Sequence, residues 1–218
     1  MAGLDPYVSC FVAMPAGDPR AAEIYGAARA VLEQAPYYWR VERAADFGQD
    51  PGPWPQRRGE LLGAHCYLAI LGGRTDLGVL IDAGRMQALG RPMLILADAD
   101  ADADAAAAAP GPPPSLAGIP QARLQSNGEQ LSTELASTVR QQPAWQALKG
   151  RDRYLSSALL SRDAGLSEQA SEQISRHYPA WQGFLDADSA AVADQAGISR
   201  HLVNAVKATL EDLRAAQA

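Results

Sequence analysis

Three aspartates occupy positions at which a carboxylate could do chemistry on a sugar. Asp82 follows a glycine-rich stretch, residues 72–78, whereas Asp46 and Asp50 lie in a segment rich in turn-forming residues, 46–55. Displacing a base from an anomeric carbon passes through an oxocarbenium-like state, which a close carboxylate can trap or stabilise. A second acid then protonates the leaving base. Asp82 suits the first role, and Asp46 or Asp50 suits the second.

Each of these aspartates also has an ordinary structural interpretation. Asp82 could be a first-turn acid that the helix dipole favours and that pairs with Arg85. Asp46 and Asp50 could simply be turn residues. The sequence leaves both interpretations open.

Asp82 belongs to residues 65–97, which have the pattern of a strand, a glycine-rich loop, a helix and a second strand. The continuous apolar runs are typical of strands covered on both faces of a parallel sheet. Asp76 is the predicted N-cap of the helix, and Gly90 follows its end. We expect one helix face to lie on the sheet, formed by Leu77, Ile81, Gly84 and Ala88. Asp82 would then lie off that face, at the sheet edge where open α/β sheets bind ligands.

The same alternation of strand and helix extends over the first two thirds of the chain. The strands are predicted at residues 7–14, 36–44, 65–71, 90–97 and 119–124. This order predicts an α/β fold: a mainly parallel sheet of about five strands flanked by helices, a flavodoxin-like arrangement. We assign this domain to residues 1–142. Residues 98–115, rich in Asp, Ala and Pro, are predicted to be a flexible insertion in it.

A second, all-helical domain is predicted at residues 151–218. It contains an ungapped repeat, residues 164–174 and 196–206, in which an Ala-Gly turn precedes a serine, Ser167 or Ser199, that can cap the next helix. Aromatic and apolar residues between the copies should form a shared core, namely Tyr178, Trp181, Phe184 and Leu185. The repeat resembles a tandem helix-hairpin-helix domain of the kind found in DNA repair and recombination proteins. That resemblance implies phosphate contacts through the hairpin turns.

Charge argues against nucleic acid as the main partner. The chain has a formal net charge of −6, and residues 151–218 carry 7 Lys and Arg against 9 Asp and Glu, a net of −2. Phosphate binding needs positive charge, so packing against the first domain or self-association is the favoured role of the helices. A homo-oligomer remains an open alternative.

The composition bounds the remaining function classes. The hydrophobic fraction of 47% and the charged fraction of 20% suit a globular protein without a membrane span. Cys10 and Cys66 fall in predicted strands as buried free thiols, and no basic leader precedes the first strand, so we expect a cytoplasmic protein. The cysteines and histidines show no metal-ligand spacing, and no metal or cofactor is expected.

Two motifs of the first domain resemble the nucleoside 2-deoxyribosyltransferase-like superfamily, which is related in fold to TIR domains. They are residues 11–15 (FVAMP) and residues 78–92 (GVLIDAGRMQALGRP). The resemblance implies cleavage or exchange of the N-glycosidic bond of a nucleoside or nucleotide by a carboxylate nucleophile. That nucleophile falls on Asp82, where the family has Glu. The predicted substrate-binding residues are Met14, Pro15, Gly17, Gly72, Gly73, Asp76, Gly78 and Arg85.

These observations favour an enzyme that hydrolyses or transfers an N-glycosidic bond. The alternative is a non-catalytic module that binds a nucleotide or takes part in signalling, with helices that contact a protein or, weakly, DNA.

Overall fold

The computed structural model describes residues 6–43, 63–71, 76–98 and 118–216. The strands are β1 (Ser9–Ala13), β2 (Arg40–Arg43), β3 (Cys66–Leu71), β4 (Met93–Asp98) and β5 (Gln121–Leu124). All neighbouring pairs are parallel, in the order β2-β1-β3-β4-β5. The prediction of a five-stranded parallel sheet is confirmed. In this order the connections leave β1 and β3 in opposite directions, which creates a ligand-binding crevice beyond their carboxyl ends.

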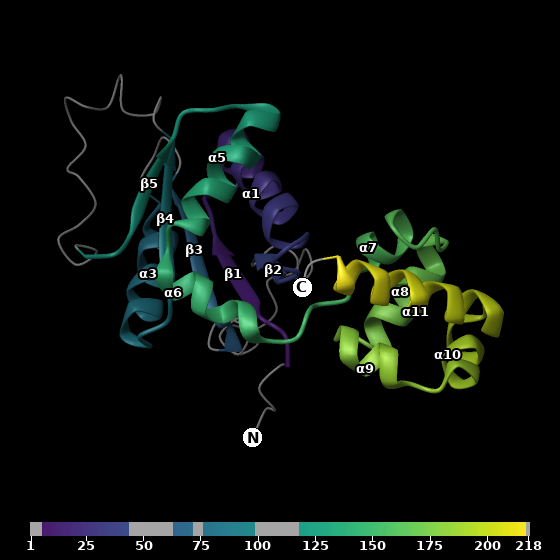
Figure 1. Ribbon diagram of the computed structural model, residues 1–218. Helices are drawn as coiled ribbons and strands as arrows, with labels where there is room; N and C mark the ends of the chain where they lie inside the picture. Colours follow the sequence, from purple (N-terminus) through teal and green to yellow (C-terminus); the bar gives the residue numbers. More distant parts are fainter. Residues whose placement is uncertain (1–5, 44–62, 72–75, 99–117, 217–218) are drawn as a thin grey trace, which may run out of the picture.

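Helices cover both faces of the sheet (Figure 1). One face packs against α1 (Pro19–Leu32) and α5 (Gly128–Arg140), and the opposite face packs against α3 (Leu77–Ala88). Alternate residues of β1 enter the two cores: Cys10 and Val12 face α1, and Phe11 and Ala13 face α3. This two-sided burial explains why the strand sequences are continuously apolar.

The prediction of which side of α3 faces the sheet is wrong. Its buried residues are Val79, Asp82, Ala83 and Met86. Leu77 is instead 70% exposed and Ile81 45% exposed. Both stripes have helical spacing, but Val79, Ala83 and Met86 form the stripe that packs in one core with strand residues, whereas Gly84 and Ala88 have little side chain to bury. Asp82 therefore lies on the covered side of the helix.

Side-chain caps begin α1 and α3, and a glycine follows the end of α3. The Asp18 carboxylate accepts hydrogen bonds from the amides of Arg20 and Ala21, and Asp76 accepts one from Val79. Gly90, with a φ of +64°, follows the last turn of α3. The predicted Asp76 cap and the glycine that follows α3 are confirmed.

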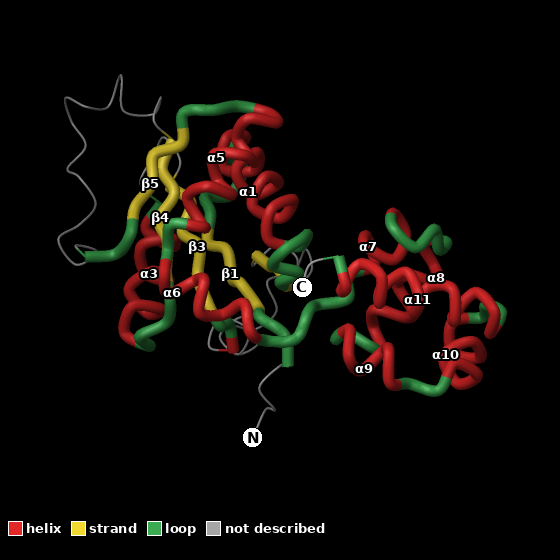
Figure 2. Tube along the Cα trace, viewed as in Figure 1, coloured by secondary structure: helices red, strands yellow, loops and turns green. Residues whose placement is uncertain are grey.

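The remaining helices form a second packed unit. They are α7 (Ser157–Arg162), α8 (Glu168–His177), α9 (Trp181–Asp186), α10 (Ser189–Ala196) and α11 (Arg200–Ala215). The chain reverses at Gly165 and Gly197, with φ of +66° and +65°, before the Ser167 and Ser199 hydroxyls cap α8 and α11. The repeated turn and both serine caps are confirmed. Figure 2 shows this unit as helix and loop beside the sheet. A short connection links it to α5, α6 (Pro143–Gln146) and the 3₁₀ turn η3 (Ala147–Gly150).

Tyr38 joins the two units. It lies two residues before β2 in the sequence, yet its ring is buried in the core of the helical unit. Its ring centroid lies 4.9 Å from that of Trp181, and the Arg153 guanidinium lies 5.3 Å from the Tyr38 ring. The Tyr154 amide donates to the Tyr38 carbonyl at 2.7 Å. The residue has a φ of +49°, an uncommon value for a side chain of this size.

The contact between the two units, which we call the seam, lies at the amino-terminal ends of the strands, as two further contacts show. Arg151 Nη1 lies 2.6 Å from His65 Nε2, just before β3. The Tyr7 and Tyr154 rings are 5.0 Å apart, just before β1. The helical unit therefore contacts the sheet edge opposite to the carboxyl ends of the strands.

Several predictions lie outside the described residues. They are the loop 46–55, the glycines at 72 and 73, and almost all of the insertion at 98–115. The domain boundaries at 142 and 151 stay a prediction. In the described part of the chain, no helix has the length and apolar character that crossing a membrane requires.

Candidate functional site

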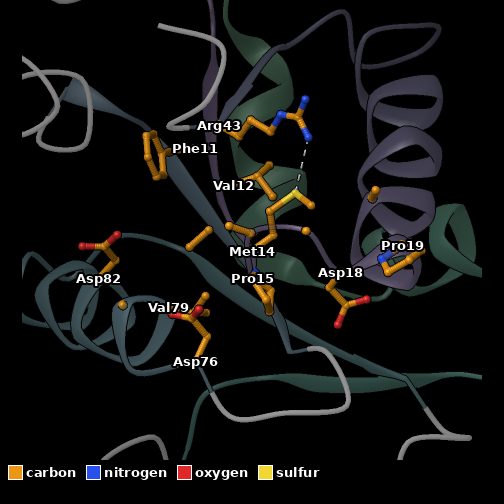
Figure 3. Close-up of a pocket in the computed structure, with 15 residues that line it drawn as sticks. Phe11, Val12, Met14, Pro15, Asp18, Pro19, Arg43, Asp76, Val79 and Asp82 are labelled. Carbon is orange, nitrogen blue, oxygen red and sulfur yellow. Dashed lines mark hydrogen bonds between the residues drawn. The ribbon is translucent and has the colours of Figure 1, made fainter. Parts of the chain in front are cut away.

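A pocket of about 650 Å³ lies at the carboxyl edge of the sheet (Figure 3). Its walls come from the end of β1, the segment that follows it, the start of α1, the first turns of α3 and the end of β2. This is the crevice beyond β1 and β3 that the strand order predicts. Its volume lies within the usual range for a small-molecule site, about 300–1,000 Å³.

Asp82 contributes a buried carboxylate to the α3 wall of this pocket. The residue is 4% exposed, and its Oδ1 accepts a hydrogen bond from Arg85 Nη1 at 3.0 Å. A buried carboxylate needs such a partner, because losing water disfavours its charge. Figure 3 shows Asp82 on α3, below Phe11, with its carboxylate directed away from Met14 and Pro15. The ion pair gives this buried carboxylate a charged partner at the pocket wall.

Two further acids line the pocket, but both hold helix ends. Asp18 caps α1 with amide hydrogen bonds of 2.9 and 3.0 Å, and Asp76 caps α3 with one of 3.1 Å. Gly17, with a φ of +73°, makes the turn that brings Asp18 to its helix. The carboxylates of Asp18 and Asp76 therefore stabilise helix ends. Among the described residues that line the pocket, Asp82 is the aspartate that caps no helix.

Arg43, the last residue of β2, supplies positive charge to the pocket. Its guanidinium lies 4.5 Å from the Tyr25 ring centroid, and its Nη1 is 3.8 Å from the Met14 sulfur. Sequence reasoning missed this residue. The signal was available, since Arg43 ends a predicted strand and the carboxyl ends of all parallel strands meet at the same edge.

The pocket brings together many of the predicted site residues. Those on its walls are Met14, Pro15, Gly17, Asp76, Gly78 and Asp82. Arg85 touches the site through its ion pair with Asp82, with 43% of its side chain exposed. Asp46, Asp50, Gly72 and Gly73 lie outside the described residues. The roles of all these residues stay predictions.

The two cysteines do not supply a nucleophile. Cys10 and Cys66 are paired in register on β1 and β3, and both thiols are free and buried. Burial, together with the neighbouring Cys10, raises the pKa of the Cys66 thiol well above its usual value. Because a thiol attacks as the thiolate, Cys66 is unreactive at neutral pH. Among the described residues, no three His, Cys, Asp or Glu side chains gather in a way that could hold a metal ion.

Comparisons of the chain with protein-family models, with curated proteins and with solved structures gave no match. The geometry of the pocket is therefore the basis for a functional proposal.

Proposed function

We propose that this chain cleaves or transfers the N-glycosidic bond of a nucleoside or nucleotide, with Asp82 as the carboxylate that acts on the sugar. One observation supports this proposal above all others. A buried, oriented carboxylate lies on the wall of a pocket of about 650 Å³ at the carboxyl edge of a parallel sheet. The resemblance of residues 11–15 and 78–92 to nucleoside 2-deoxyribosyltransferase-like proteins agrees with the same position.

The proposed chemistry assigns a separate task to each group. Asp82 attacks or stabilises the anomeric carbon as the bond to the base breaks. Arg85, 3.0 Å from its Oδ1, orients it. A second acid protonates the departing base, and Asp46 or Asp50 is the candidate for that step. Water or a second base then takes the sugar, which separates a hydrolase from a transferase.

Asp82 is shorter than the glutamate of the resembled family by one methylene, a loss of reach of about 1.5 Å. A misplacement of ~1 Å can lower a rate about a hundredfold. Arg85 restrains the shorter side chain on the same wall, so substrate must approach α3 closely. The first turn of the helix permits this approach because Gly78, which also lines the pocket, has no side chain.

The test is to incubate the purified protein with nucleosides, nucleotides and NAD, and to measure free base by chromatography. We expect base release by the wild type and its loss in Asp82→Asn. Asp163→Asn is the matched control, because Asp163 pairs with Arg162 on the exposed surface of the helical unit. Absence of base release in both the wild type and Asp82→Glu would contradict the proposal.

A second candidate function is non-catalytic binding of a nucleotide. The observation that favours it is the use of Asp18 and Asp76 as helix caps, since neither is then free to protonate a leaving base. Here the helical unit, with its helix-hairpin-helix-like repeat, would contact a partner protein or DNA. Calorimetric binding of a nucleotide that is recovered intact would support this candidate over the enzyme.

A further inference from the structure

The outward side of α3 carries an apolar stripe in solvent. It consists of Leu77, Ile81, Gly84 and Ala88, which we call the α3 face. At about 100° per residue these four positions fall within about 60° of one another. Leu77 is 70% exposed and Ile81 45%, and both small residues are exposed as well. The other large apolar residues that are exposed in the described chain are Leu89, 43% exposed at the end of α3, and Leu202, 36% exposed on α11.

We propose that the α3 face binds a second copy of this chain, with the two α3 helices antiparallel about a two-fold axis. The stripe is its own complement when reversed. With the axis between positions 82 and 83, Leu77 lies opposite the partner's Ala88, and Ile81 lies opposite the partner's Gly84. Each large side chain thus meets a small one, so the helices can approach closely without overpacking. A two-fold interface must match itself in this manner.

Charge at the ends of the stripe favours the same arrangement. Asp76 stands at the amino end of α3, and Arg91 follows its carboxyl end. Antiparallel pairing brings the Asp76 end of each helix to the Arg91 end of the other, so opposite charges meet at both ends. The two helix dipoles are also opposed, which is their favourable alignment.

The size of the face sets the strength of the dimer. Twelve residues of helix extend about 18 Å, so the contact lies at the small end of specific interfaces, below the usual ~800 Å² per partner. We expect reversible association that depends on protein concentration. The opposite side of α3 forms a wall of the pocket, and the proposal does not depend on what that pocket binds.

Sedimentation velocity over a series of protein concentrations tests the association. We expect the wild type to shift from monomer to dimer as concentration rises, and Leu77→Glu/Ile81→Glu to remain monomeric with an unchanged circular dichroism spectrum. Leu202→Glu, at an exposed apolar position on α11, should dimerise as the wild type does. A wild type that is monomeric throughout, or a dimer that survives the two glutamates, overturns the proposal.

Cysteine cross-linking tests the register. About the proposed axis, two copies of position 84 are about 4–5 Å apart along the helices, and two copies of position 88 are about 16 Å apart. A cysteine at Gly84 is tolerated because an added Cβ meets nothing within 4 Å. We expect Gly84→Cys to form disulfide-linked dimers under mild oxidation and Ala88→Cys not to. Equal cross-linking of both variants, or of neither, overturns the antiparallel register.

Discussion

Replacing Tyr38 by alanine should uncouple the helical unit from the sheet. The ring is 3% exposed and packs in the helical core. Its burial is worth about 1.5–3 kcal/mol, the Trp181 ring contact at 4.9 Å adds about 0.5–1.5 kcal/mol, and the Arg153 contact at 5.3 Å adds about 0.5–1 kcal/mol. We expect Tyr38→Ala to lower the free energy of unfolding by about 3–5 kcal/mol, the usual cost of removing a buried aromatic side chain.

Urea unfolding measures this loss, followed by tryptophan fluorescence and by far-ultraviolet circular dichroism. The wild type should unfold in one transition, because the Tyr38 ring shares a core with α7, α8 and α11. In Tyr38→Ala the helical unit should unfold first and give a second transition. Tyr38→Phe is the control, because it keeps the ring and should cost at most about 1.5 kcal/mol. A loss below about 1 kcal/mol in Tyr38→Ala, with a single transition, would refute this view of the seam.

Three further tests follow from the surroundings of single residues: one on a helix cap, one on a pair of glycines and one on a buried thiol. Ser199→Ala removes the hydroxyl that caps α11 and should cost about 1 kcal/mol of unfolding free energy. Gly78→Ala places a Cβ 2.9 Å from Asp76 Oδ1 and should lower the thermal midpoint, whereas Gly26→Ala, with nothing within 4 Å, should raise stability by about 0.5–1 kcal/mol. Stability should fall as pH rises above about 8.5, where the unfolded Cys66 thiol ionises, because the raised pKa keeps the folded thiol protonated.

The controls for these three tests are direct. Ser175→Ala, on the exposed surface of α8, should leave the urea midpoint nearly unchanged if capping is the reason for the Ser199 effect. Equal effects of the two glycine variants would contradict the close approach at Gly78. The alkaline loss of stability should be shallower in Cys66→Ala than in the wild type. An identical slope would show that other groups cause it.

The sequence was most informative where local rules act alone. Continuous apolar runs predicted β1, β3 and β4 because both faces of a parallel sheet are covered. Asp76, Ser167 and Ser199 were correctly predicted as caps, because capping depends on a few adjacent residues.

Prediction failed where two sides of one helix had equally good apolar spacing. It also failed where the residue in contact is distant in sequence. Both sides of α3 have helical apolar spacing, and only the strands packed against it select Val79 over Leu77. Tyr38 and Trp181 are far apart in the chain, so no local pattern could reveal their contact. Arg43 was missed although its strand was predicted, because its contacts in the pocket are with Met14 and Tyr25, which are distant in sequence. The pocket edge was predictable from the order of elements, but the burial of Asp82 was not.

The seam between the two units is separated from the pocket by the length of the strands. The segment that leads into α7 contacts the sheet through Arg151 and Tyr154, just before β3 and β1, whereas the pocket lies at the other end of β1. Substitutions in α7 to α11 can therefore disturb the contact between the two units without changing any residue that lines the pocket.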